Sequence, residues 1–445
     1  MILLLGVAFL TSFALYVYLL SRSVYFGWMS LLAVQFYEFS FGIGAVIVGG
    51  IHLDPVDIVN LGLLAAGVIR TIPRLRERNT ARLIGLAYLA IFAFSLLRGA
   101  IFNGFITAAN EARGFVPILL GVLYFLTAPV DSNSVRKYIR LYIYYGVGFV
   151  IVAFLAYAGV RVGGRAWLHS AEAASNTIED RLLPAAAALG VSLCFVFSMA
   201  WVGHRSSGTL FRWLPVIFLG TAVFLRHRSV WVVLIFSMVS LFFTDGRLFR
   251  RFIPIAVLSL VVIAAFASVA SFTATPDAED TVTSTQAEFS ESASDQGTWT
   301  WRVHVWISYV LGEDQTILAV LLGKNLGDGY VSLNPEAGTW LNAPPHSEYV
   351  AEYTRVGLLG LILQLCFVIR PLTRLWPLSS TKLLAVEPSA SAWTAVILGT
   401  IVYGVTYSVP PDVYALVGIA SAAIANLNSE AVVPRAEVLL HADAV

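Results

Sequence analysis

The sequence is dominated by apolar runs of roughly 15 to 22 residues that are separated by short polar stretches. A helix needs roughly 20 apolar residues to cross the hydrocarbon layer of a bilayer, so this pattern is typical of a helical membrane protein. Charged residues make up only 12% of the 445 residues, whereas soluble proteins carry about 25%. We therefore expect an all-α polytopic membrane protein with about 12 to 14 transmembrane helices.

The apolar runs predict spans at residues 2–20, 24–50, 57–69, 83–97, 114–128, 138–159, 183–202, 212–225, 229–243, 252–272, 351–369, 391–408 and 411–426. The run 24–50 fits either one long helix or two short ones, and this leaves the side of the N-terminus open. The net charge of +1 gives no reason to expect a nucleic-acid partner.

Basic residues predict which loops face the cytoplasm. Sixteen Lys or Arg lie in the loops 70–82, 131–140, 203–213, 244–251 and 370–382, whereas the alternate loops carry nine over much more chain. Basic loops stay on the cytoplasmic side, so the long segment 273–350 is expected to be external. The chain then divides into an N-terminal helix bundle (1–272), this external segment, and C-terminal helices with a cytoplasmic tail (351–445).

The external segment has three parts. Residues 273–298 contain six acidic and no basic residues, a composition that favours a solvated linker. The stretch 299-WTWRVHVWISYVL-311 predicts a helix on the membrane surface, with Arg302, Trp306 and Tyr309 on one face. Residues 323–346 are rich in Gly and Pro, which indicates a turn-rich path that ends at His346.

Arginines on the external side oppose the charge bias and need a physical reason. Arg226 and Arg228 stand at a turn between two apolar spans, and Arg302 lies in the external segment. One interpretation is a pair of helix-end arginines that anchors the turn at the interface. The other is a cationic pocket for phosphate, since guanidinium groups match phosphate oxygens. Further candidates for substrate contact are Arg98, Arg113, Trp306, Tyr309 and Glu352, although Glu111 is able to neutralise one of the two arginines.

His346 is the strongest candidate for proton transfer. It precedes a membrane helix and lies on the same predicted side as the external arginines, whose charge would lower its pKa and keep the imidazole neutral. A neutral imidazole is able to take a proton from a hydroxyl group. Glu348, Glu352 and His304 are alternative bases, and a loop histidine without a catalytic role is the competing interpretation. The sequence contains no acidic metal motif, so we expect a site without metal or other cofactor.

Four stretches resemble the O-antigen ligase and O-antigen polymerase superfamily of integral membrane glycosyltransferases. They are 345-PHSEYVAEYTRVGLLGLILQL-365, 302-RVHVWISYVLGEDQTILAVLLGKNLGDGY-330, 226-RHRSV-230 and 110-NEARGFVPILLGVLYFL-126. Where the family usually has a Ser-Arg pair, this chain has His227 before Arg228. About 100 residues carry these motifs, and their order and spacing also agree with the family.

The resemblance implies a GT-C-like fold and an inverting, metal-independent transfer on the outer face of the bacterial inner membrane. A glycan would move from an undecaprenyl diphosphate carrier to an acceptor sugar, with His346 as the base and Arg226, Arg228 and Arg302 on the diphosphate. The family includes surface-polysaccharide polymerases, which can act with a chain-length regulator, and ligases of lipopolysaccharide biosynthesis that use lipid A-core as acceptor. The long external segment slightly favours a polymerase, and a lipid-linked glycan flippase or a scaffold protein are the alternatives from other classes.

Overall fold

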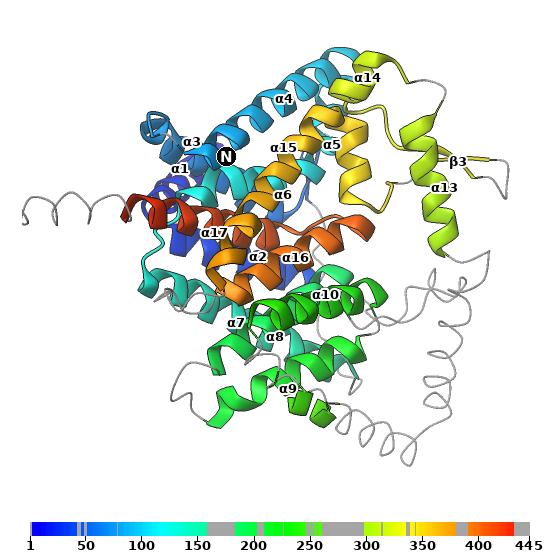
Figure 1. The fold of residues 1–445 in the computed structure, drawn as a ribbon. Coiled ribbons are helices and arrows are strands. Elements are labelled where there is room, and N and C mark those ends of the chain that lie inside the picture. Colours follow the sequence, from blue (N-terminus) through cyan, green and yellow to red (C-terminus); the bar gives the residue numbers. More distant parts are fainter. Residues whose placement is uncertain are drawn as a thin grey trace, which may run out of the picture.

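The computed structural model describes residues 2–41, 46–48, 51–77, 79–157, 183–202, 209–225, 227–245, 250, 253–255, 257–259, 298–312, 315–334, 339–342, 344–379 and 390–430. Helices make up most of this part of the chain (Figure 1). Two short antiparallel hairpins interrupt them, β1 (Val46–Val48) with β2 (Ile51–Leu53), and β3 (Val331–Asn334) with β4 (Thr339–Asn342). The expected helical class is confirmed, and the hairpins lie in the connections between helices.

The expected spans coincide with helices where the structure describes them, except that part of the run 24–50 is wrong, because Val46–Val48 in it form strand β1 and pair with β2. The run 24–50 is helical only to Phe41, and residues 260–272 of another span lie outside the described residues. The helices are α1 (Ile2–Arg22), α2 (Val24–Phe41), α3 (Pro55–Thr71), η1 (Ile72–Arg74), α4 (Thr80–Asn103), α5 (Phe105–Ala112), η2 (Arg113–Phe115), α6 (Val116–Leu119), η3 (Leu120–Tyr124), η4 (Phe125–Thr127), α7 (Ser132–Tyr157), α8 (Ala185–Val202), α9 (Thr209–Phe224), α10 (Arg228–Thr244), α13 (Thr298–Leu311), α14 (Ile317–Leu322), α15 (Glu348–Ser379), α16 (Ala390–Thr406) and α17 (Pro411–Glu430).

Several helices have the length and apolar character needed to cross a membrane. Among the described residues these are the stretches Pro55–Arg74, Thr80–Asn103, Phe105–Thr127, Asn133–Ala156 and Glu348–Trp376, and six shorter apolar helices accompany them. Large apolar side chains also cover much of the outside. Ile101, Phe102 and Phe105 are 69%, 70% and 66% exposed. An outer surface of this kind is stable against lipid, which indicates a membrane-embedded helical protein.

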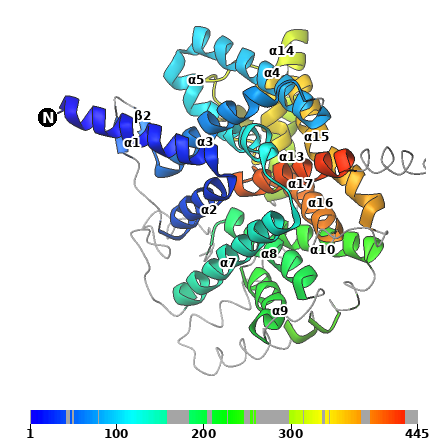
Figure 2. The ribbon, with the colours of Figure 1, turned by 90° about the vertical axis from the view of Figure 1, so that its left-hand side faces the viewer.

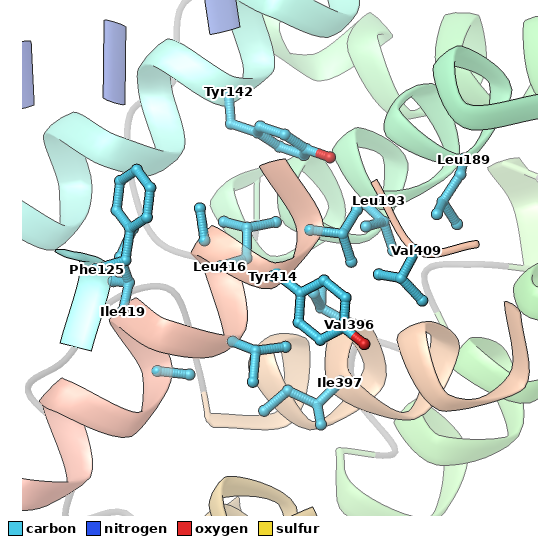
Figure 3. Close-up of a cluster of buried hydrophobic side chains, with 14 of the residues drawn as sticks. Phe125, Tyr142, Leu189, Leu193, Val396, Ile397, Val409, Tyr414, Leu416 and Ile419 are labelled. Atoms are coloured by element: carbon cyan, nitrogen blue, oxygen red, sulfur yellow. The ribbon is translucent and has the colours of Figure 1, made fainter. Parts of the chain in front are cut away.

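The core is built around α17, which passes between the α3–α4 side and the α7–α8 side of the bundle (Figures 1 and 2). Its residues Val413 to Val417 are at most 1% exposed. Side chains from α7, α8, α16 and α17 face one another in this region (Figure 3). At Gly418 an added Cβ would meet the carbonyl oxygen of Gly121. Glycine therefore allows the backbones of α17 and η3 to come into direct contact.

Helix α15 is interrupted at Gly357, where φ is 77° and ψ is −176°. A Cβ at this position would collide with the carbonyl oxygen of Leu321 and the amide of Gly323. The end of α14 is thus pressed against the break in α15, and Lys324 N donates a 2.7 Å hydrogen bond to Thr354 O. A positive φ is easy for glycine alone, so the break depends on both the conformation and the missing side chain of Gly357.

We predict that Gly357→Ala destabilises the folded protein by about 1–3 kcal/mol or more, because it adds both backbone strain and a steric clash. Thermal unfolding in detergent measures the effect. Gly220→Ala is the matched control, since Gly220 lies inside α9 with no heavy atom within 4 Å of its Cβ position. The control should be neutral or slightly stabilising. Equal unfolding temperatures for Gly357→Ala and wild type would show that the contact at the break is unimportant.

Candidate active site

The pairing of α10 with α16 places Arg228 at the C-terminal end of α16. Ser237 Oγ donates a 3.2 Å hydrogen bond to Ala395 O, and a Cβ at Gly399 would lie 2.9 Å from Val233 Cγ1. Ser237 thus pairs with Ala395, and Val233, four residues earlier in α10, pairs with Gly399, four residues later in α16. The helices are therefore antiparallel, and the start of α10 with Arg228 as its first residue points towards the C-terminal end of α16.

Helix α13 brings Arg302 to the same end of α16. Arg302 Nη1 donates to Thr406 O at 3.4 Å, and the guanidinium carbon lies 5.1 Å from the centroid of the Tyr407 ring. Trp306, one helical turn further along, donates from Nε1 to Pro345 O at 2.6 Å. The helix face predicted from the sequence thus packs on the protein, and Trp306 ties it to the residue before His346.

His346 is fixed between two anchored residues. Pro345 before it accepts the hydrogen bond from Trp306, and the hydroxyl of Ser347 after it donates to Gly404 O at 3.4 Å. His346 has a φ of 48°, and in the described part of the chain it is the only residue other than glycine with a positive φ. Such a conformation is costly for most side chains and persists when the surroundings impose it, often at functional sites. The residue is accessible at the surface, although protein atoms surround part of its imidazole ring.

The three residues with the main predicted roles, Arg228, Arg302 and His346, therefore gather at one end of α16. Partial burial of the imidazole lowers the pKa of His346 below its ordinary value, and the positive charge of Arg302 lowers it further. Both effects favour the neutral ring at physiological pH. A neutral imidazole beside guanidinium groups is able to accept a proton next to a site that attracts an anion.

The two predicted alternative bases on α15 are buried, and Glu348 is engaged in hydrogen bonds inside the protein. Glu348 is 5% exposed and accepts hydrogen bonds from Val409 N (3.1 Å), Tyr414 Oη (2.8 Å) and Gln364 Nε2 (3.0 Å). These bonds hold the first turn of α15 against α17. Glu352 is fully buried beside Tyr88 of α4. Neither carboxylate is presented to the surface on which His346 is exposed, so His346 is the better placed base.

Arg98 binds backbone carbonyls. Its Nη2 donates to the carbonyl oxygens of residues 322, 323 and 324 at 3.1, 2.6 and 3.0 Å, at the end of α14. The last carbonyls of a helix have no partner within it, and Arg98 supplies one. Arg113 instead lies 3.4 Å from Asp57 in an ion pair. These two arginines therefore have partners of their own away from the end of α16.

Arg355 is a structural residue that stands out in none of the sequence motifs. It is 0% exposed, and its Nε lies 2.6 Å from Glu111 Oε1. It also donates to Asn325 O at 3.0 Å and stacks on the ring of Tyr330 at 4.5 Å. Glu111 thus neutralises Arg355, rather than Arg98 or Arg113. An arginine inside an apolar span was the available signal, because a charge there needs a partner.

Of the other residues named in the sequence analysis, Tyr309 and His227 are buried, and Arg226 is not described by the structure. Tyr309 is 3% exposed and packs edge-on against Tyr330, so it contacts protein rather than lipid headgroups. Arg226 and the acidic stretch up to residue 297 lie outside the described residues. His227, at the start of α10, is buried with its Nε2 2.7 Å from Leu183 O. Among the described residues, no group of three or more His, Cys, Asp or Glu is arranged to hold a metal ion.

We predict that Arg302→Gln raises the pKa of His346, because the substitution removes a positive charge that opposes protonation of the ring. NMR titration of protein labelled at histidine measures this pKa, with His346→Asn used to assign the signal. Arg136→Gln is the charge-matched control on an exposed position of α7, and it should leave the titration unchanged. An unaltered pKa in Arg302→Gln would contradict the predicted proximity of the two groups.

The chain matches no model of a known protein family and no curated protein. A proposal for its function therefore has to be argued from the chemical groups that the fold brings together. These are the Arg302 guanidinium, an exposed imidazole and the indole that supports its loop, at the end of α16 towards which the first residue of α10, Arg228, also extends.

Proposed function

We propose that the protein is a membrane glycosyltransferase that moves a glycan from an undecaprenyl diphosphate carrier to an acceptor sugar. The observation that supports this most directly is the gathering of Arg228, Arg302 and His346 at one end of α16. Guanidinium groups attract a diphosphate, and the neutral imidazole is available as a base. The proposal also uses the resemblance of the same stretches to the O-antigen ligase and polymerase superfamily.

In the proposed reaction, His346 takes the proton of an acceptor hydroxyl as its oxygen attacks the anomeric carbon of the donor. The bond between that carbon and the diphosphate oxygen breaks, and the electron pair leaves with the lipid diphosphate. Arg228 and Arg302 stabilise the negative charge that develops on the leaving group. Attack opposite the leaving group inverts the anomeric centre, and the arginines provide the charge stabilisation without a metal ion.

Within this function, polymerisation of a surface polysaccharide is the preferred activity, on the outer face of a bacterial inner membrane. The alternative is ligation of a finished polymer to lipid A-core. Deleting the gene and running surface and carrier-linked glycans on a gel separates the two. Loss of the ladder down to one repeat unit on the acceptor means a polymerase. A full ladder that stays on the carrier means a ligase.

A transporter of lipid-linked glycans is the second candidate, and one observation favours it. Helix α15 is broken at Gly357, and buried Glu352 and Arg355 lie close to the break, as in many transporters. However, Arg355 is neutralised by Glu111 and bound to the turn after α14. The break therefore has a structural explanation, and the groups suited to chemistry lie at the end of α16.

We predict that His346→Asn lowers the transfer rate by about 10²- to 10⁴-fold, the usual contribution of a general base, while the protein still folds. Asparagine tolerates positive φ better than most residues, so the backbone conformation is kept. The rate is measured with purified protein and lipid-linked donor. Thermal unfolding checks that the variant is folded.

His304→Asn is the matched control, because His304 is exposed on α13 only two residues from Arg302. This variant should keep nearly the wild-type rate. Near-normal transfer by His346→Asn together with loss in His304→Asn would move the base to His304. Near-normal transfer by both variants would remove the case for a histidine base and make transport the leading candidate.

We predict that Arg228→Ala and Arg302→Ala each weaken use of the donor, and that the corresponding Lys variants recover only part of the loss. Lysine keeps the charge but lacks the planar fork that binds two phosphate oxygens at once. Steady-state kinetics with varied donor concentration measures the effect. Full activity of both Lys variants would show that charge alone attracts the donor.

A further inference from the structure

Tyr407 lies directly beneath the cation that the proposed function assigns to the leaving group. The Arg302 guanidinium carbon is 5.1 Å from the centre of the Tyr407 ring, within the range of a cation–π interaction. The Tyr407 ring is itself stacked on Tyr403, with centroids 5.4 Å apart and an angle of 21° between the planes. Tyr403 is 1% exposed in α16. A fixed aromatic stack thus extends from the core to Arg302.

We infer that Tyr407 is a positioning residue, whose ring face holds the Arg302 guanidinium in place to receive the diphosphate of the lipid donor. The inference rests on the proposed function for the identity of the anion. The positioning itself rests on the contacts of the stack and on the place of Tyr407 just after the end of α16, where Arg302 and Ser347 beside His346 both bind backbone carbonyls.

The chemistry of the contact explains why a ring suits this role better than a carboxylate. An acidic partner would neutralise Arg302 and occupy the N–H groups that a phosphate needs. A ring attracts the cation through its face and leaves the N–H edges of the guanidinium available. In the described part of the chain, Arg302 forms no ion pair, and its one hydrogen bond, to Thr406 O, is long at 3.4 Å. The ring is therefore the main contact that orients Arg302.

A purely structural role for Tyr407 is the competing explanation. Tyr403 already fills the interior, whereas Tyr407 is only half-buried. If Tyr407 were only packing, replacing it by another apolar side chain of similar size would leave Arg302 in position. The two explanations therefore differ in how Arg302 responds to loss of the aromatic face.

The test compares Tyr407→Phe, which keeps the ring, with Tyr407→Leu, which removes it. The affinity of purified protein for inorganic pyrophosphate is measured by calorimetry, and the pKa of His346 is followed by NMR. We expect Tyr407→Leu to weaken pyrophosphate binding about 3- to 10-fold and Tyr407→Phe to bind like wild type. Tyr407→Leu should also raise the pKa of His346, because a displaced Arg302 no longer opposes its protonation.

A second substitution keeps the test valid if Tyr407→Leu does not fold. Tetrafluorophenylalanine at position 407 preserves the shape of the ring and weakens the attraction of its face for a cation. It should reproduce the effects expected of Tyr407→Leu. Wild-type pyrophosphate affinity and an unchanged His346 pKa in this variant would overturn the inference. So would equal losses in Tyr407→Phe and Tyr407→Leu, which would assign the role to the hydroxyl group.

Combining substitutions separates this inference from the proposed function. If Tyr407 acts through Arg302, Tyr407→Leu should have no further effect on the His346 pKa in an Arg302→Gln background. Additive shifts would overturn the inference. If both single variants shift the pKa but the wild-type protein neither binds pyrophosphate nor transfers glycan, the positioning role stands and the proposed function fails.

Discussion

A turn without regular structure is stable among apolar helices only when its backbone groups have hydrogen-bond partners, and two arginines meet this requirement here. Arg98 binds three carbonyls at the end of α14, and Arg355 binds the turn that follows while Glu111 balances its charge. The same turn reaches the break in α15 at Gly357. The chain from α13 to His346 passes through this fixed turn, and the neighbours of the histidine are then held by Trp306 and Gly404.

The end of α16 acts as the common support of the candidate site. It is reached by the first residue of α10, by Arg302 of α13 and by Ser347 beside the histidine. These segments are far apart in the sequence, and each is held by a different contact with α16, at Ala395 and Gly399 for α10, at Thr406 for α13 and at Gly404 for Ser347. A network around Glu348 fixes the start of α15 and the start of α17 relative to each other. The loop of the site is therefore connected through α15 to the buried start of α17.

Much of the fold was predictable because apolar length alone determines where membrane helices form. The distribution of basic residues predicts that Arg228, Arg302 and His346 share the external side of the membrane, but it does not predict that α16 is the helix they share. The partners of Arg98 and Arg113 were not predictable, since they depend on which turn lies beside each helix. The break at Gly357 depends on contact with α14, and the role inferred for Tyr407 depends on a stack that only the fold creates. Neither leaves a periodic signal in the sequence.

Helix α13 carries Arg302 and also holds the residue before His346 through Trp306. One rigid element therefore connects the group that would stabilise the leaving diphosphate to the loop that presents the base. Any displacement of α13 from the bundle would disturb both together. A donor bound without α13 in place would meet neither an aligned cation nor a supported base. In the proposed enzyme, this arrangement would protect an energy-rich lipid-linked sugar from wasteful hydrolysis by water.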